Sequence, residues 1–278
     1  MIRVGIGLPN VIAGADRRVL ADWAREADTA GFASVGVVDR LNYDVCEPLL
    51  ALAAAAAVTE RIALLTNVLI GPIRPTALLV KQVCSLHDLS GGRVTLGIGL
   101  GGRADDYAAA GLETRGRGTR LGEQLDALRA SPRGEDLRIL IGGNTDHAIP
   151  RIVRWADGWS MTLGTPEQLA AGRSAVEDAW RAAGRSGRPT VQALCYFSFG
   201  PDAERNARSS LEDYYGWLGP ERASMIAGTA ALDPKAFQAR VRAFEAAGAD
   251  AIVAMPCDHN IDQLERLASA AAPWLNGA

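Results

Sequence analysis

A regular alternation of apolar strands with helical segments constrains the fold of this chain more than any other feature of its sequence. Eight short runs rich in Val, Ile and Leu are each followed by a segment in which apolar residues recur at helical spacing. The strands are predicted at 2–8, 34–38, 61–68, 96–100, 137–141, 158–161, 190–199 and 251–255. Strands that alternate with helices pair in parallel, and eight such units favour a single closed (β/α)8 barrel, the TIM barrel, over an open doubly wound sheet.

One domain is expected over residues 1–278, because this length is typical of one such barrel and no long linker rich in Pro or Ser divides the chain. No repeat is evident beyond the rhythm of strands and helices. One helix is predicted after the fourth strand, at 119–130, and two after the seventh strand, at 202–218 and 233–247.

Composition and charge exclude several classes of function. The net charge is −3, so no basic excess attracts nucleic acid or an anionic membrane. The N-terminus lacks the apolar core of a signal peptide and no apolar run approaches the roughly 20 residues of a membrane span, so a cytoplasmic protein is expected. Neither a metal site nor a disulfide framework is predicted for the four widely spaced cysteines, Cys46, Cys84, Cys195 and Cys257.

Gly97, Gly99 and Gly102 spell the G-x-G-x-x-G pattern of a dinucleotide-binding turn, but their surroundings do not fit that motif. Gly97 and Gly99 alternate with apolar residues in one run and are therefore predicted to lie inside a strand. The acid at the usual distance, Glu123, falls in a segment with helical spacing. Strand glycines either serve core packing or let a flat ligand approach the backbone, and the residues alone leave both open.

In a (β/α) barrel the active site lies at the C-terminal ends of the strands. The candidates predicted there are Pro9, Asn10, Asp39, Arg40, Asn67, Gly99 to Arg103, Gly142 to Thr145, Thr162, Ser198 and Pro256 to His259. The loop Gly142, Gly143, Asn144, Thr145 is the most specific of these, since backbone N–H groups of a glycine turn at a helix start can bind a phosphate. An ordinary loop with Asn144 or Thr145 as the helix N-cap is the alternative.

Six short motifs stand in a specific order along the chain. They are T-E-R-I at 59–62, K-Q at 81–82, L-S-G-G-R at 89–93, G-I-G at 97–99, I-G-G at 141–143 and D-G-W at 157–159. In this order they resemble the bacterial luciferase-like superfamily of flavin- or deazaflavin-dependent oxidoreductases, which are (β/α) barrels. The resemblance runs from Val4 to about Trp274.

The resemblance implies that the ring of FMN or of coenzyme F-420 lies across the C-terminal mouth and acts on a small organic substrate. Gly97, Gly99 and Gly101 would then form a wall without side chains, and Gly142, Gly143, Asn144 and Thr145 would bind the phosphate. Asn67 could hydrogen-bond the carbonyl and nitrogen edge of the ring. Asp39 is the candidate catalytic carboxylate, which could accept a proton or only pair with Arg40. A homodimer is expected.

Two departures from the family pattern affect these expectations. Many relatives that use F-420 carry Asp-His where this chain has Asp39-Arg40, so a mechanism that relies on that histidine cannot be carried over. The connection at 129–136 is shorter than in many relatives, and we expect it to leave the mouth more open or to leave the lid to another subunit.

Two functions therefore remain open, and a third is disfavoured. The first is an oxidoreductase in which the reduced cofactor donates hydride or reacts with dioxygen to monooxygenate the substrate. The second is a redox-inactive flavin-binding protein, which the short connection favours. A barrel enzyme without flavin is the third, but the sequence lacks a G-x-S-x-G elbow, clustered metal ligands and a strand-end lysine.

Overall fold

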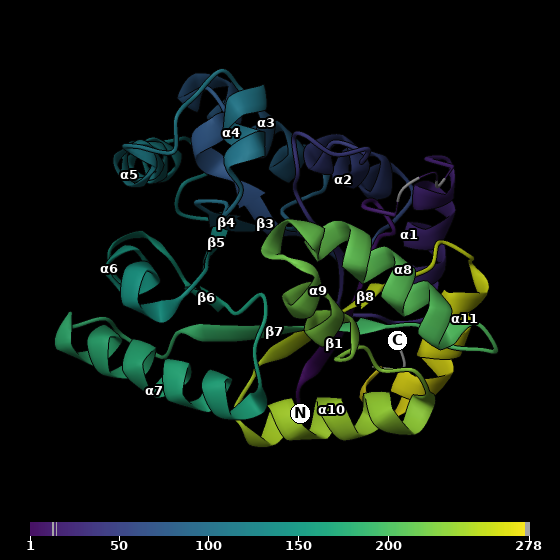
Figure 1. Cartoon of the computed structure of the whole chain (residues 1–278). Helices are drawn as coiled ribbons and strands as arrows, with labels where there is room; N and C mark the ends of the chain where they lie inside the picture. Colours follow the sequence, from purple (N-terminus) through teal and green to yellow (C-terminus); the bar gives the residue numbers. More distant parts are fainter. Residues whose placement is uncertain (13, 15, 276–278) are drawn as a thin grey trace.

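The eight predicted strands form one closed barrel in chain order, and each strand runs parallel to its neighbours (Figure 1). The computed structural model describes residues 1–12, 14 and 16–275. The strands are β1 Arg3–Gly7, β2 Ser34–Val37, β3 Ala63–Ile70, β4 Val94–Gly99, β5 Arg138–Gly142, β6 Gly158–Ser160, β7 Thr190–Phe197 and β8 Ala251–Pro256. The barrel prediction is confirmed, and the open sheet and the dinucleotide-binding turn are both wrong.

Helices surround the barrel, and several begin at residues suited to that position. They are α1 Val19–Thr29, α2 Pro48–Ala57, α3 Thr76–Leu89, α4 Ala104–Ala109, α5 Arg117–Arg129, α6 Thr145–Trp155, α7 Pro166–Ala182, α8 Ala203–Tyr215, α9 Pro220–Ala227, α10 Pro234–Ala246 and α11 Asp262–Ala271, with short 3-10 turns η1 Gly71–Ile73, η2 Gly216–Leu218 and η3 Ala272–Trp274. Glu47 and Asp233 cap α2 and α10, and Thr165 with Gln168 forms a capping box at α7. Among the described residues, no helix is both long enough and apolar enough to cross a membrane.

The sequence pattern predicts neither α4 nor α9. The first has only six residues, too few for helical periodicity to stand out. The second is separated from η2 by Gly219, whose φ of 89° ends the preceding helical run. Both additions lie on the C-terminal side of the barrel, where α4 follows β4 and where α8, η2 and α9 follow β7.

An irregularity in β3 explains the glycines of β4 and β5. The pairing of β3 with β4 shifts between Thr66 and Leu69, and the peptide bond from Asn67 to Val68 is cis. A Cβ at Gly97 would lie 2.1 Å from the carbonyl oxygen of Thr66, and a Cβ at Gly142 would lie 2.7 Å from Cγ1 of Val68. At Gly99 the distance to Cγ2 of Val68 would be 3.1 Å. These three glycines, here called the glycine nest, therefore leave room for the protein's own β3.

We expect Gly97→Ala to lower the free energy of unfolding by about 1–3 kcal/mol, because the added methyl group collides with backbone that can only move by shifting β3. Chemical denaturation of the cofactor-free protein measures this loss. Gly216→Ala is the control, since its Cβ would meet nothing within 4 Å and its φ of −53° suits alanine. A Gly97→Ala protein as stable as the control would contradict the packing role of Gly97.

Candidate functional site

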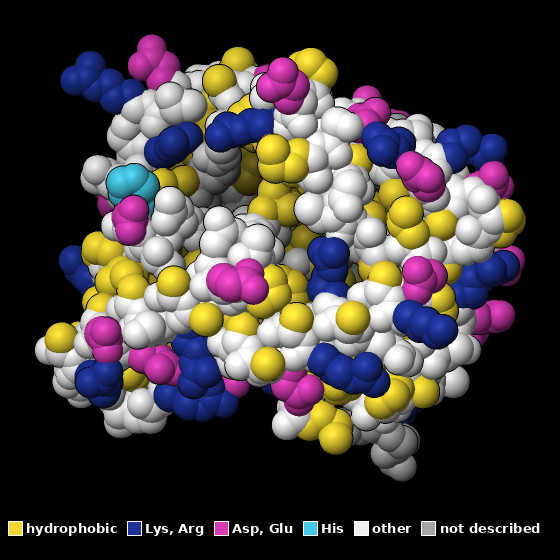
Figure 2. All heavy atoms as spheres, turned by 60° about the horizontal axis from the view of Figure 1, so that its bottom comes forward, with side chains coloured by type: hydrophobic (Ala, Val, Ile, Leu, Met, Phe, Trp, Pro, Cys, Tyr) yellow, Lys and Arg dark blue, Asp and Glu magenta, His cyan; other side chains and the backbone are white. Residues whose placement is uncertain are grey.

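A cavity of about 420 Å³ opens at the C-terminal end of the barrel. Its walls come from the ends of β2 to β5, from the loop before α4, and from α5, α6, α8 and η2. Figure 2 shows a hollow in one face of the molecule, with hydrophobic side chains inside it and Lys or Arg side chains at its rim. A volume of this size is typical of sites that hold small molecules and cofactors.

Most of the residues predicted from the strand ends do line this cavity. They are Asp39, Arg40, Asn67, Gly99, Leu100, Gly101, Gly102, Arg103, Gly142, Gly143, Asn144 and Thr162. Gly97 and Thr145 are not brought to its wall: Gly97 faces the backbone of β3, and Thr145 is the first residue of α6. Among the histidines only His147 lines the cavity, whereas His259 is exposed elsewhere and His87 is buried in α3.

Aromatic residues of α8 and η2 cover the cavity and form what we call the roof. Tyr214, Tyr215 and Trp217 line it from this side. The hydroxyl groups of Tyr215 and Tyr196 lie 2.6 Å apart in a hydrogen bond, and burial raises the pKa of Tyr214 to about 12. Sequence reasoning missed the roof, although the cluster Tyr-Tyr-x-Trp at the end of an amphipathic helix was the signal that could have indicated it.

The short connection at 129–136 does not affect the mouth, contrary to expectation. It joins α5 to β5 and therefore lies at the N-terminal end of the barrel. There the Arg129 side chain donates to the carbonyl oxygens of Gly134, Leu137 and Trp155. The opening of the cavity is set by the roof instead.

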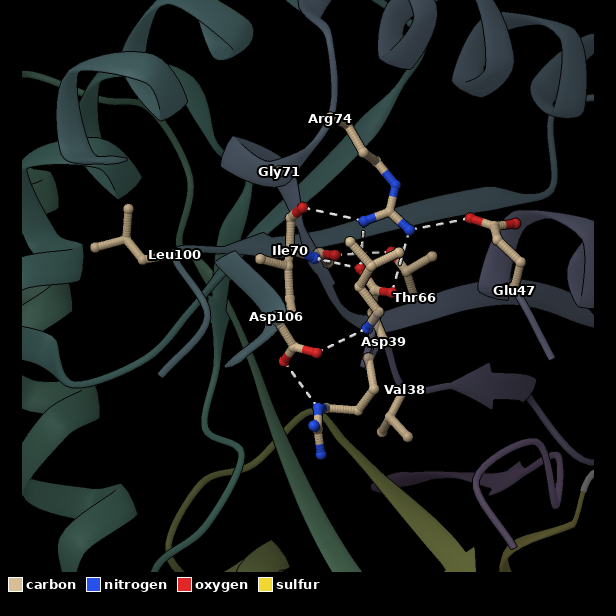
Figure 3. A network of polar contacts seen from close by, with 12 residues as sticks. Val38, Asp39, Glu47, Thr66, Ile70, Gly71, Arg74, Leu100 and Asp106 are labelled. Atoms are coloured by element: carbon tan, nitrogen blue, oxygen red, sulfur yellow. Dashed lines mark hydrogen bonds and ion pairs between the residues drawn. The ribbon is translucent and has the colours of Figure 1, made fainter. Parts of the chain in front are cut away.

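Asp39 is buried in an ion-pair network with Arg74 and not with Arg40, so the expected partner was wrong. One carboxylate oxygen accepts from the Ile70 N–H at 2.7 Å and from Arg74, and the other accepts from Arg74 Nη2 at 3.1 Å. Arg74 also donates to Glu47 at 3.0 Å, as Figure 3 shows. Burial raises the pKa of the Asp39 carboxyl, and the attraction of Arg74 works against that rise. Both carboxylate oxygens are thus engaged in holding β2, β3 and α2 together.

Arg40 instead reaches α4. Its Nε donates to Asp106 at 2.8 Å, and its Nη2 donates to Asp105 at 3.2 Å and to the Asn42 carbonyl oxygen at 3.3 Å. The guanidinium carbon also lies 5.2 Å from the ring centre of Tyr43 and 5.7 Å from that of Tyr214. The cation is therefore fixed between strand end, α4 and roof.

A second arginine shares one of these carboxylates. Arg103 binds Asp105 with Nε at 3.1 Å and with Nη2 at 2.8 Å. This hydrogen bonding holds the pKa of Asp105 at about 2. Two arginines and two aspartates thus balance each other's charge beside the cavity.

Asn67 projects from the irregular part of β3 toward the barrel axis. Its side-chain oxygen accepts from the Ser160 hydroxyl at 2.8 Å and from the Gln192 amide at 3.3 Å. Its amide nitrogen is buried and, in the part of the chain that the structure describes, has no hydrogen-bond partner. A buried donor without a partner is costly, so this amide is suited to a ligand that supplies an acceptor.

The end of the cavity beside β5 carries excess positive charge. Asn144 caps α6, where its side-chain oxygen accepts from the Asp146 N–H at 3.3 Å. Arg117 and Arg151 line the same cavity, and among the described residues they bind only carbonyl oxygens, those of Gly101, His147 and Gly118. Burial lowers the pKa of Arg151. Two cations that have no carboxylate partner in this part of the chain, near a helix N-terminus, are suited to an anion.

Within the described residues, no group of three His, Cys, Asp or Glu side chains is placed to hold a metal ion. The four cysteines are free. The arrangement can therefore bind an acceptor edge at Asn67 and an anion at Arg117 and Arg151, and the roof covers part of the cavity.

Comparison with known proteins identifies relatives of this architecture. The family model for luciferase-like monooxygenases matches residues 2–254. An uncharacterized protein of Mycobacterium tuberculosis is 32% identical over 177 residues, which cover 53% of this chain and 61% of that protein. The chain thus matches about three fifths of the length of this relative.

Two solved structures share the fold over almost the whole chain. An F-420-dependent secondary alcohol dehydrogenase in complex with an F-420–acetone adduct superposes with a TM-score of 0.81 at 16% identity, covering 99% of each chain. The oxygenating constituent of the 3,6-diketocamphane monooxygenase of Pseudomonas putida, a type II Baeyer–Villiger monooxygenase in complex with FMN, superposes with a TM-score of 0.75 at 15% identity, again covering 99% of each chain.

The contacts of Asp39 make its role testable. Asp39→Ala leaves the buried Arg74 with the partly exposed Glu47 as its remaining carboxylate partner among the described residues, so we expect the free energy of unfolding to fall by about 3 kcal/mol, the lower end for a broken buried pair. The double change Asp39→Leu with Arg74→Met should recover most of this loss, because no buried charge then lacks a partner. Chemical denaturation of both variants measures these changes in the free energy of unfolding. An Asp39→Ala protein with the stability of the wild type would contradict the role of Asp39 in the scaffold.

Proposed function

The chain belongs to the luciferase-like monooxygenase family, whose members are flavin- or F-420-dependent oxidoreductases and monooxygenases, and from this premise we propose its function. It is an oxidoreductase that binds FMN or coenzyme F-420 in the cavity at the barrel mouth and acts there on a small organic substrate. The observation that carries this proposal is the buried Asn67 amide without a partner in the wall of that cavity.

The residues at the cavity fit the ring of such a cofactor. Both FMN and F-420 carry a ring edge of carbonyl oxygens and nitrogens, which would accept the hydrogen bond that Asn67 offers. The surface beside it is made by Val68 and Gly99, since Val68 fills the glycine nest and both residues line the cavity. The family resemblance implies a wall without side chains at this place. We propose that Val68, packed on the glycine nest, forms the wall instead.

The cofactor, when bound, supplies the redox chemistry, as hydride donor or, for reduced FMN, by activating dioxygen. The protein's own contribution is binding, orientation and exclusion of water. Tyr214 and Trp217 cover part of the cavity, which limits the access of water to the reacting atoms. Asp39, fully engaged by Arg74 and the Ile70 N–H, holds the end of β2 in place and is proposed as a positioning residue.

The phosphate of the cofactor is proposed to lie at Gly143 and Asn144, between Arg117 and Arg151. Nothing lies within 4 Å of the position of a Cβ at Gly143, so the loop leaves open space there. Asp146 in the first turn of α6 adds negative charge, and the two arginines compensate for it. Thr145 is the first residue of the helix, so its backbone N–H adds a donor on the same side.

We further propose a cytoplasmic homodimer of one domain, residues 1–278, with no nucleic-acid or membrane partner. A surface for a second copy is suggested by α2 and α3, which pack beside each other and expose Leu50 to 66% and Leu78 to 51%. The redox-inactive alternative loses its support, because the short connection at 129–136 lies at the other end of the barrel.

Thermal unfolding with each cofactor tests the proposed function. We expect either FMN or F-420, at about 100 times its Kd, to stabilise the protein by about 2.7 kcal/mol and so to raise Tm. Reduced cofactor of the same kind should then be oxidised as a carbonyl substrate is converted, and omission of the protein should abolish this conversion. No shift with either cofactor would overturn the proposal, and a shift without any turnover would restore the redox-inactive alternative.

Removing the phosphate from the ligand tests the anion site. Arg151→Met should weaken FMN binding at least about tenfold, about 1.4 kcal/mol, and leave riboflavin binding unchanged, because only FMN carries the charge that Arg151 would meet. For F-420 its phosphate-free chromophore takes the place of riboflavin. Arg154→Met on the same helix is the control, since this side chain is 64% exposed and does not line the cavity. Equal losses for FMN and riboflavin would place the phosphate elsewhere.

A further inference from the structure

The donors of Arg40 are used unequally. A guanidinium has five N–H groups, one on Nε and two on each terminal nitrogen. In Arg40 the Nε group donates to Asp106, and Nη2 donates to Asp105 and to the Asn42 carbonyl oxygen. In the part of the chain that the structure describes, Nη1 has no partner, although the side chain is only 3% exposed. Two N–H groups of a buried cation are thus left over.

The surroundings prevent Arg40 from turning to satisfy Nη1 elsewhere. Asp106 is itself fixed, because its other oxygen accepts from the N–H groups of Leu41 and Asn42 at 2.8 and 2.9 Å. Tyr43 and Tyr214 lie against the guanidinium. Arg40 lines the cavity, and Nη1 is the nitrogen of its guanidinium that the described residues around it leave without an acceptor.

We propose that Arg40 binds the carboxylate of the substrate, which is a small organic acid with an apolar body. This inference rests on the proposed function, because it names the substrate class of the same cavity. Arg40 is assigned a role in binding and specificity: Nη1 donates to the carboxylate, and the apolar body of the acid packs against the roof at Tyr214 and Trp217. Asp105 and Asp106 position the guanidinium for this contact.

The chemistry of arginine selects an acid over an alcohol or a ketone. A guanidinium stays charged at any pH at which the protein is folded, so it cannot hand a proton to an oxygen as a histidine would. It can stabilise an oxygen that is already anionic, through charge-assisted hydrogen bonds from Nη1. A neutral substrate would leave the buried cation without the partner that Nη1 lacks.

Charge around the site is consistent with this assignment. Arg40 and Arg103 are balanced by Asp105 and Asp106, so the group as a whole does not repel an anion. Arg117 and Arg151 line the cavity from α5 and α6 and are proposed to meet the cofactor's phosphate. Two anionic groups, one from each ligand, would thus be bound by different arginines of one cavity.

The test compares acids with neutral molecules of the same shape. Benzoate and benzamide are titrated at constant ionic strength into the protein loaded with FMN or F-420, and the absorbance of the bound cofactor is followed. Acetate and acetamide form a second pair that the cavity volume does not exclude. We expect the acid of at least one pair to bind at least about tenfold tighter than its amide. If in both pairs the acid binds no tighter than the amide, the proposal is overturned.

Variants then assign the preference to Arg40. Arg40→Lys keeps the charge but not the donors at Nη1, so it should lower affinity for the acid at least about tenfold and leave affinity for the amide and for the cofactor within about threefold. Arg93→Lys is the matched control: Arg93 is held by five hydrogen bonds at the other end of the barrel, and its variant should keep the preference for the acid. An unchanged preference in Arg40→Lys would overturn the proposal.

Two further measurements test the position of the acid without an Arg40 variant. In the double variant Arg117→Met with Arg151→Met the preference for the acid should persist, and its loss there would move the acid to the proposed phosphate site and overturn the assignment without relying on an Arg40 variant. The thermal shift that benzoate gives this double variant without cofactor, compared with benzamide, reads the acid site separately, because Arg117 and Arg151 are then absent. If neither cofactor binds, the proposed function fails, and this second reading still decides whether Arg40 binds an acid.

Discussion

The contact on which the functional end of this barrel depends is the insertion of Val68 into the glycine nest. Because Gly97, Gly99 and Gly142 carry no side chains, β3 can leave its regular pairing between Thr66 and Leu69 and press against β4 and β5. This displacement places Asn67 at the barrel axis, where Ser160 and Gln192 fix its oxygen and leave its amide free for a ligand. A side chain at Gly97 would meet backbone, and the position of Asn67 would be lost with it.

The arginines around the mouth differ in how completely their charge is satisfied. Arg74 uses both terminal nitrogens of its guanidinium to bind Asp39, Glu47 and the Ile70 carbonyl oxygen, and it ties the scaffold together. Among the described residues, Nη1 of Arg40 is buried without a partner, and Arg117 contacts a carbonyl oxygen and an aromatic ring but no carboxylate. Since an unsatisfied cation is costly in a buried place, this difference supports a structural role for Arg74 and the proposed ligand-binding roles of Arg40 and Arg117.

The barrel and the residues at its strand ends are predicted well from the sequence. The spacing of apolar residues along a single chain shows where strands and helices alternate. It predicts the contacts between strand ends poorly. Asp39 and Arg40 are neighbours in the chain, yet adjacent residues at a strand end point to different sides, so Asp39 reaches Arg74 while Arg40 reaches α4. The displacement of β3 leaves no periodic signal, so the glycines were assigned to a ligand instead of to Val68. The roof lies in a segment whose helices are predicted but whose position over the cavity depends on tertiary packing.

The segment that carries the roof leaves the barrel and returns to it at the same place. Phe197, the last residue of β7, pairs with Ala231, and Ser198 and Tyr196 hydrogen-bond the backbone of Ala231 at 3.0 and 2.8 Å. The segment between these points, which contains α8, η2 and α9, is therefore a cassette whose two ends are already joined (Figure 1). Such a cassette can lengthen, shorten or change its aromatic residues over evolutionary time without altering the register of any barrel strand. The selectivity of the cavity can thus diverge while the fold beneath it stays the same.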